Sequence, residues 1–171
     1  TDNQEYVITW FRWANDERAL VSVRFSDTRE GVDSQETRLL AVNRDGTQQN
    51  GNLLRVSSFP SIFGKKHFPQ FQDRLVGTIP GDPRHVLIAL DLERPNSPDV
   101  YKVDIYSGER TLVQTNPGLQ PGPRNVLQWI ADREGRLRVG VGQFGTTVRV
   151  IYKVPESTLW RELAEYDLAK E

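Results

Sequence analysis

One layout of short β-rich runs occurs three times along this chain, and this repetition limits the possible fold more than any other feature. The repeats run from Thr9 to Val56, from Val76 to Val113 and from Val126 to Leu163. Each begins with an apolar run, makes a polar turn that leads into an arginine, and continues through two β-rich runs to a tight turn and a last short strand. Four short antiparallel strands that recur about every 40 to 60 residues are typical of β-propeller blades.

We therefore predict an all-β fold of about three four-stranded antiparallel β-propeller blades, which form a single partial propeller domain over residues 1–171. The blades are placed approximately at residues 6–57, 74–116 and 125–168. A β-propeller normally closes a ring of about 4 to 8 blades, so three blades would form an open arc.

Two segments are less regular than the repeats around them. Residues 27–36 are polar and are predicted to form a loop between the middle strands of the first repeat. Residues 157–168 fit either a fourth strand of the third repeat or a helix with Leu159 and Leu163 on one face. We favour the strand, which the repeats place at Leu159–Leu163, because the register of the repeats outranks local propensity where the two conflict.

Charge and composition exclude several classes of function. The chain has 22 basic and 23 acidic side chains, well mixed, whereas proteins that bind phosphate backbones show a basic excess or a clustered basic face. We therefore expect no nucleic-acid partner. We also expect no membrane insertion, because no apolar segment approaches the roughly 18 to 20 residues that span a bilayer. The absence of cysteine removes disulfides, thiolate metal ligands and cysteine nucleophiles, and it fits the cytoplasm and the periplasm equally.

The residue types needed for catalysis do not occur in a recognisable pattern. No serine lies in the G-x-S-x-G motif of a serine hydrolase, and only two histidines are present, His67 and His85. Neither histidine has a suitably spaced acid nearby for a catalytic triad or a zinc site. The sequence from Gly140 to Gly145 matches G-x-G-x-x-G, but no helix is predicted after it. We predict no catalytic, cofactor-binding or metal-binding residue.

The connection between the first two repeats, residues 57–73, is longer and more aromatic than connections between blades usually are. Its phenylalanines could fill the gap between neighbouring blades, or they could dock a partner domain, since aromatic anchors are favoured at interfaces. The candidate partner-interface residues are Phe59, Phe63, Lys65, Lys66, His67, Phe68 and Phe71.

Four segments of the repeats resemble a known family. They are LLAVNRDG at residues 39–46, IPGDPRHVLI at 79–88, VYKVDIYSG at 100–108 and WIADREGRLR at 129–138. With these segments the chain resembles the N-terminal β-propeller of prolyl oligopeptidase-family serine peptidases, in particular the bacterial dipeptidyl- and acylaminoacyl-peptidase-like branch. Related propellers of the TolB type share the same pattern of a strand, an Asp-Gly turn and a strand.

In that family the propeller is not the catalyst. It caps an α/β-hydrolase domain that carries the Ser-Asp-His triad, and it restricts access to short peptides. The resemblance thus implies a non-catalytic part of a serine peptidase, whose partner would be the α/β-hydrolase domain of the same full-length protein and which would meet peptide substrates only through that domain. No position of this chain matches the triad. The alternatives are a stand-alone propeller-type interaction module and a TolB-like periplasmic scaffold.

An open arc also predicts exposed apolar faces at its two ends, where Trp10, Trp13, Trp129 and the loop phenylalanines would otherwise meet neighbouring blades. We therefore expect a homodimer, in which two arcs pair across a two-fold axis and imitate a six-bladed ring, with the loop from Phe59 to Phe71 at or near the contact. The alternative is that this loop and the C-terminal stretch cover the open ends and the chain stays monomeric.

Overall fold

The computed structural model describes residues 5–29, 31–56, 67–118 and 125–170. Within these ranges the chain forms eleven β-strands and no helix, which confirms the all-β prediction. The same ranges accordingly contain no helix long and apolar enough to cross a membrane. The strands are β1 (Val7–Trp13), β2 (Arg18–Arg29), β3 (Val32–Asn43), β4 (Leu75–Ile79), β5 (Asp82–Leu90), β6 (Asp99–Asp104), β7 (Arg110–Gln114), β8 (Gln128–Ala131), β9 (Leu137–Phe144), β10 (Thr147–Tyr152) and β11 (Arg161–Asp167).

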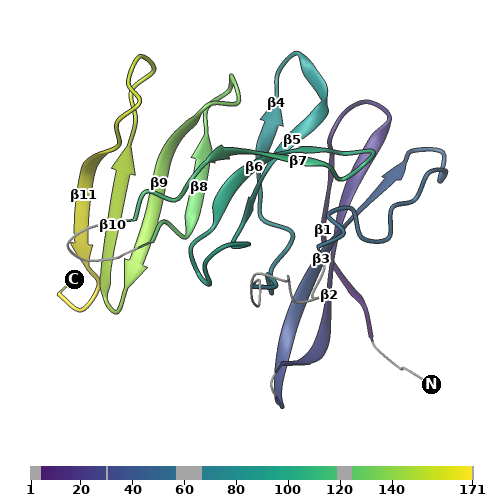
Figure 1. Cartoon of the computed structure of the whole chain (residues 1–171), viewed down its shortest axis with the longest axis horizontal. Coiled ribbons are helices and arrows are strands. Elements are labelled where there is room, and N and C mark those ends of the chain that lie inside the picture. The colour runs from purple at the N-terminus through teal and green to yellow at the C-terminus, as the bar shows by residue number, and fades with distance from the viewer. Residues whose placement is uncertain (1–4, 30, 57–66, 119–124, 171) are drawn as a thin grey trace.

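The strands form three separate antiparallel sheets, each with its strands side by side in chain order. The first sheet is β1-β2-β3, the middle sheet is β4-β5-β6-β7, and the third sheet is β8-β9-β10-β11. Figure 1 shows the three sheets in this order along the longest axis of the molecule, with the middle sheet between the other two. Each sheet lies within one of the residue ranges predicted for the blades, 6–57, 74–116 and 125–168.

The first sheet has three strands among the described residues, so the prediction of four strands is wrong for this repeat. At the free edge of β3, Asn50 forms an isolated antiparallel bridge with Ala41, and the amide of Leu53 donates to the carbonyl of Leu39 at 2.8 Å. Glycine and asparagine at positions 50–52 disfavour an extended strand. An irregular segment therefore occupies the place of the fourth strand.

The polar loop predicted at residues 27–36 is also wrong. β2 and β3 continue as a long hairpin whose pairing extends to Arg29 and Val32, and Gly31 at its tip has a φ of +82°. Two-residue hairpin turns require positive φ, which glycine adopts without steric cost. The polarity of this segment reflects exposure of the hairpin tip and not a loss of strand structure.

The strand interpretation of the C-terminal stretch is confirmed, and the helix alternative is wrong. β11 begins at Arg161 and pairs with β10 through contacts that include Tyr166 opposite Val148. The repeat register placed this strand two residues too early, at Leu159.

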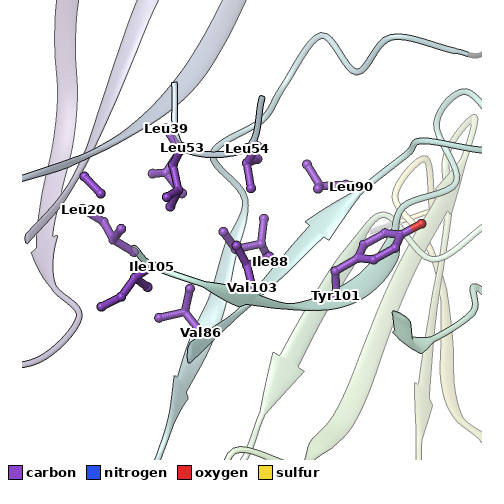
Figure 2. Close-up of a cluster of buried hydrophobic side chains, with 11 residues drawn as sticks. Leu20, Leu39, Leu53, Leu54, Val86, Ile88, Leu90, Tyr101, Val103 and Ile105 are labelled. Atoms are coloured by element: carbon purple, nitrogen blue, oxygen red, sulfur yellow. The ribbon is translucent and has the colours of Figure 1, made fainter. Parts of the chain in front are cut away.

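Hydrophobic clusters on both faces of the middle sheet join it to its neighbours. Along β5, Val86, Ile88 and Leu90 belong to the cluster shared with the first sheet, whereas Leu87 and Ala89 belong to the cluster shared with the third. Figure 2 shows the first cluster, with Leu20, Leu39, Leu53, Leu54, Val86, Ile88, Leu90, Tyr101, Val103 and Ile105 labelled. The second cluster contains Leu87, Ala89, Val100, Val126, Trp129, Leu137 and Ile151. β5 is thus apolar at successive positions because both of its faces are covered.

Turn contacts show that the three sheets are stacked in the same orientation. The side-chain amide of Asn15, in the β1–β2 turn, donates to the carbonyl of Pro83 beside the β4–β5 turn at 2.8 Å. In the β8–β9 turn, a Cβ added to Gly135 would lie 3.2 Å from the Cα of Ile79. The first hairpin turns of all three sheets therefore meet at one end of the stack.

A glycine pair tests how the irregular segment of the first repeat is held against the middle sheet. Gly46 and Gly108 have φ values of +80° and +76°, and a Cβ would meet nothing within 4 Å at Gly46 but would overlap the carbonyl oxygen of Leu53 at Gly108. Gly46→Ala should lower the free energy of unfolding by about 1 kcal/mol, the cost of positive φ for a residue with a Cβ. Gly108→Ala should lower the free energy of unfolding by about 1 to 3 kcal/mol more than Gly46→Ala does, because the backbone at Leu53 has to move away from the new Cβ.

Urea unfolding of both variants, followed by circular dichroism, measures this difference. Equal losses in the two variants would contradict the close approach of Leu53 to the β6–β7 turn.

Candidate functional site

The predicted partner-interface residues fall in the connection between the first and middle sheets. Phe59, Phe63, Lys65 and Lys66 lie outside the described residues, whereas His67, Phe68 and Phe71 are placed. The described part of the connection, residues 67–74, runs along the first sheet before β4 begins. The carbonyl of Gln70 accepts a hydrogen bond from the amide of Thr37 on β3 at 3.0 Å. The partner role of these residues stays a prediction.

Phe68 packs against two arginines of the first sheet. Its ring centroid lies 5.4 Å from the guanidinium carbon of Arg29 and 4.9 Å from that of Arg38. The ring of Phe25 lies 5.1 Å from Arg38 in the same group. Both guanidinium groups bind the carboxylate of Glu36, with Arg38 Nη2 at 2.8 Å from Oε2 and Arg29 Nη2 at 2.9 Å from the same oxygen. We call these five residues the arginine–phenylalanine cluster.

The buried carboxylate of Glu36 stays ionised because of its two arginines. Its side chain is only 1 % exposed, and burial on its own would raise its pKa. The hydrogen bonds and charges of Arg29 and Arg38 outweigh burial and lower the pKa of Glu36 below its ordinary value. Because the arginines bind Glu36 and stack on aromatic rings, the cluster fastens residues 67–74 to the first sheet.

Asp73 joins the same connection to all three strands of the first sheet. Its carboxylate accepts hydrogen bonds from Trp10 Nε1 on β1 at 3.2 Å, from Ser22 Oγ on β2 at 2.6 Å and from Thr37 Oγ1 on β3 at 2.5 Å. Ser22 is fully buried, so Asp73 satisfies a hydroxyl that water does not reach. Sequence reasoning missed Asp73, because a single acid in a polar segment carries no signal of partners this far along the chain.

Asn116 has the corresponding role in the connection between the middle and third sheets. Its side-chain amide nitrogen donates to the carbonyls of Val126 at 2.7 Å and Pro98 at 3.1 Å, and its Oδ1 accepts from the amide of Val126 at 3.1 Å. The amide of Asn116 itself donates to Asp99 Oδ1 at 2.6 Å. The residue is 3 % exposed, and its polar groups are satisfied by the two segments that it joins.

Arg18 links the first sheet directly to the middle sheet. It is 1 % exposed, its Nε donates to the carbonyl of Ile105 at 2.8 Å, and its Nη1 donates to Asn43 Oδ1 at 2.6 Å. Its guanidinium carbon lies 4.8 Å from the ring centroid of Tyr106. Burial lowers the pKa of Arg18 from its usual value, and the charges of Tyr106 and Asp104 oppose this effect. The arginine after the first polar turn is therefore an inter-sheet contact.

Each histidine has a carboxylate partner, which corrects the prediction that no suitable acid lies nearby. His67 Nε2 lies 3.1 Å from Asp91 Oδ2, on the loop after β5, and His85 Nδ1 lies 2.7 Å from Asp82 Oδ1. Asp82 also binds Lys102 Nζ at 2.6 Å, and the bonds to Lys102 and His85 lower the pKa of Asp82 to about 2.

Across the described ranges, no group of three or more His, Asp or Glu residues is placed to hold a metal ion.

The glycine-rich sequence at 140–145 serves packing. Gly140 lies in β9, where a Cβ would come within 3.0 Å of Val126 and 3.1 Å of Ile151. β10 follows the turn after Gly145, so the helix that a phosphate-binding glycine motif requires is not there.

Three cavities border the middle sheet, and two of them have linings that combine basic and acidic side chains. One, of about 660 Å³, combines basic side chains (Arg55, Lys102 and Arg110) with acidic ones (Asp104 and Glu109). The other, of about 420 Å³, lies where the turns of the first and middle sheets meet, and its lining is Asn15, Asp16, Glu17, Pro83, Arg84 and Tyr106. Both linings mix opposite charges, so neither selects one class of ligand by charge.

Comparisons of the chain with protein-family models, with curated proteins and with solved structures find no match.

Asp73→Ala should lower the free energy of unfolding by about 3 kcal/mol, because three hydrogen bonds to a partly buried carboxylate from Trp10, Ser22 and Thr37 are lost. Urea unfolding measures the change. The matched control is Asp33→Ala, an exposed acid on β3 that should change stability by less than about 0.5 kcal/mol. A loss in Asp73→Ala as small as that of the control would show that the connection is held by other contacts.

Glu36→Gln should lower stability by about 2 kcal/mol at neutral pH, because it leaves two arginines with one neutral acceptor. The pKa of Glu36 is lower in the folded state than in the unfolded state, where it is about 4.3. Its ionised carboxylate therefore stabilises the fold fully above the unfolded pKa, and this stabilisation is lost as the pH falls through the folded pKa. Wild-type stability should therefore fall more steeply below about pH 5 than that of the variant. Urea midpoints measured at several acidic pH values provide the comparison, and parallel curves would contradict this role of Glu36.

Proposed function

We propose that this chain is three consecutive blades of a β-propeller and that it serves as a non-catalytic cap in a prolyl oligopeptidase-like serine peptidase, where it limits access to a hydrolase domain. The observation that carries the proposal is the stacking of three antiparallel sheets in one orientation, with the middle sheet covered on both faces. Successive blades of a propeller repeat one sheet around an axis, and such a repeat requires this arrangement.

The position of the first strands of successive sheets also supports a propeller. A Cβ added to Gly77 on β4 would lie 3.7 Å from the Cβ of Ala131 at the end of β8. Adjacent blades of a propeller approach one another through the strands nearest the central axis. β4 and β8 are each the first strand of a four-stranded meander, so the repeated connection returns the chain to the same side of the stack.

A non-catalytic role agrees with the surroundings of the titratable residues. The two histidines bind Asp91 and Asp82, and the serine with the best acidic partner, Ser22, is fully buried against Asp73. A buried hydroxyl on a central strand of a sheet cannot attack a substrate, because catalysis requires the nucleophile to reach the reacting atom. The resemblance of residues 79–88 and 100–108 to the peptidase propellers points to the kind of protein in which such a scaffold acts.

The sequence of the open reading frame beyond Glu171 tests the peptidase proposal. We expect a G-x-S-x-G motif a few hundred residues downstream, followed by the acid and the histidine of a triad. Further strand repeats without a hydrolase domain would contradict the proposal in favour of a TolB-like scaffold. An end of the frame near Glu171 would contradict it in favour of a stand-alone interaction module.

An activity assay tests the non-catalytic role of the chain itself. With chromogenic aminoacyl and peptidyl substrates we expect no turnover above buffer, and the same result for a variant with His67→Gln and His85→Gln. Turnover that stays proportional to the concentration of the chain through successive purification steps would contradict this role.

A further inference from the structure

The two ends of the three-sheet stack present apolar sheet faces. Inside the stack, Leu20 and Ala41 are paired on the face toward the middle sheet. The next pair, Val21 with Leu40, therefore points outward, and Phe11 of β1 pairs with Val21 on the same face. We define the first flank as Ile8, Phe11, Trp13, Val21, Leu40 and Val42.

The third sheet has an outer face of the same kind. Trp129, Gly140 and Ile151 are paired across β8, β9 and β10 and face the middle sheet. The adjacent row of Ile130, Val139 and Tyr152 therefore faces outward. We define the third flank as Ile130, Val139, Val141, Val148, Val150 and Tyr152.

These faces correct the expected positions of the tryptophans. Trp10 packs on the core between the first and middle sheets, and Trp129 lies in the core between the middle and third sheets. Of the three tryptophans expected at the ends of the arc, only Trp13 is on an outer face, where it is 55 % exposed.

The two flanks carry side chains of different size. The first flank carries large projecting side chains, since Ile8 is 65 % and Phe11 is 69 % exposed. The third flank consists mainly of four half-buried valines, Val139, Val141, Val148 and Val150. Stacked sheets lie about 10 Å apart, and they fill this space by packing large side chains of one sheet over small branched side chains of the next.

The large side chains of the first flank make this face costly to leave in water. Bulky aromatic side chains bury on the order of 150 to 250 Å² each, so Phe11 and Trp13 with Ile8 expose several hundred Å² of apolar surface. Exposed apolar patches of this size on soluble monomers mark interaction sites.

We propose that the first flank binds the third flank of a second copy of this chain. The two flanks are the outer faces of the sheets at the two ends of the row (Figure 1), so a second copy that docks in this way continues the row head to tail. The contact reproduces the packing of sheet on sheet that already exists twice inside each copy.

Two copies suffice to close the assembly, an inference that rests on the proposed propeller geometry. Propeller rings contain about 4 to 8 blades, and six is the only multiple of three in that range. The ring has a two-fold axis, and each copy uses both flanks, so two identical interfaces form.

Sedimentation equilibrium with flank variants tests the proposal. At micromolar concentration the wild-type chain should have twice its monomer mass of 19.6 kDa. Phe11→Glu and Ile130→Glu each place a charge on one flank at an exposed position, so each variant should fold and be monomeric. The matched control is Val113→Glu, at a 51 % exposed position on β7 that belongs to neither flank, and it should associate like the wild type.

Mixing the two flank variants distinguishes head-to-tail from symmetric contact. A mixture of Phe11→Glu with Ile130→Glu contains one intact first flank and one intact third flank, so it should recover a species of two copies although each variant alone is monomeric. Circular dichroism of each variant establishes that it is folded.

Several outcomes would overturn the proposal. A wild-type chain that stays monomeric would show that the flanks do not bind second copies, and it would leave the test of the open reading frame unaffected. Association of Ile130→Glu at wild-type strength would show a symmetric contact between first flanks. Masses above two copies that both flank variants abolish would support the head-to-tail contact and contradict the closed ring of two, and with it the propeller geometry.

Discussion

The burial of both faces of the middle sheet is the constraint on which the rest of the structure depends. Along the second half of β5, Val86 and Ile88 face one neighbour while Leu87 and Ala89 face the other, so neither face of residues 86–90 is left for water. Each fully buried aliphatic side chain contributes roughly 1.5 to 3 kcal/mol relative to exposure. A strand of this composition requires a sheet on each side, and the first and third sheets supply them. The stack of three layers follows from this requirement.

Stacked sheets touch only through side chains, so their connections set how each sheet is placed on the next. Asp73 ties one connection to three strands of the first sheet, and Asn116 ties the other to the start of the third. Arg18 adds a direct bond from β2 to the backbone of the middle sheet. Apolar packing alone tolerates sliding, whereas buried polar groups are satisfied in one arrangement only. These three residues therefore give the stack its register.

Periodicity and turn chemistry were sufficient to predict an all-β chain of three sheets, because alternation and turn residues are local properties. The strand at β11 was also predictable, since the repeat supplied its place. The hairpin of β2 and β3 was not, because its exposed tip is polar and resembles a loop in sequence. The partner of His67 and the bonds of Asp73 were missed because they depend on which segments the fold brings together. Asp82, the partner of His85, lies only three residues away in β5, so that miss was an error in reading the local sequence. Contacts between segments far apart in sequence leave no local pattern to read.

The central claim is that the middle sheet is the most protected layer, and native-state hydrogen exchange tests it most directly. We predict that the slowest amides lie in β5 and β6 and exchange only through global unfolding, because both faces of these strands are covered. Amides of β1 and β11, which have an outer face and an edge, should exchange faster through local opening. Protection in β5 no greater than in β1 and β11 would contradict the account, because it would mean that the middle sheet does not hold the stack together.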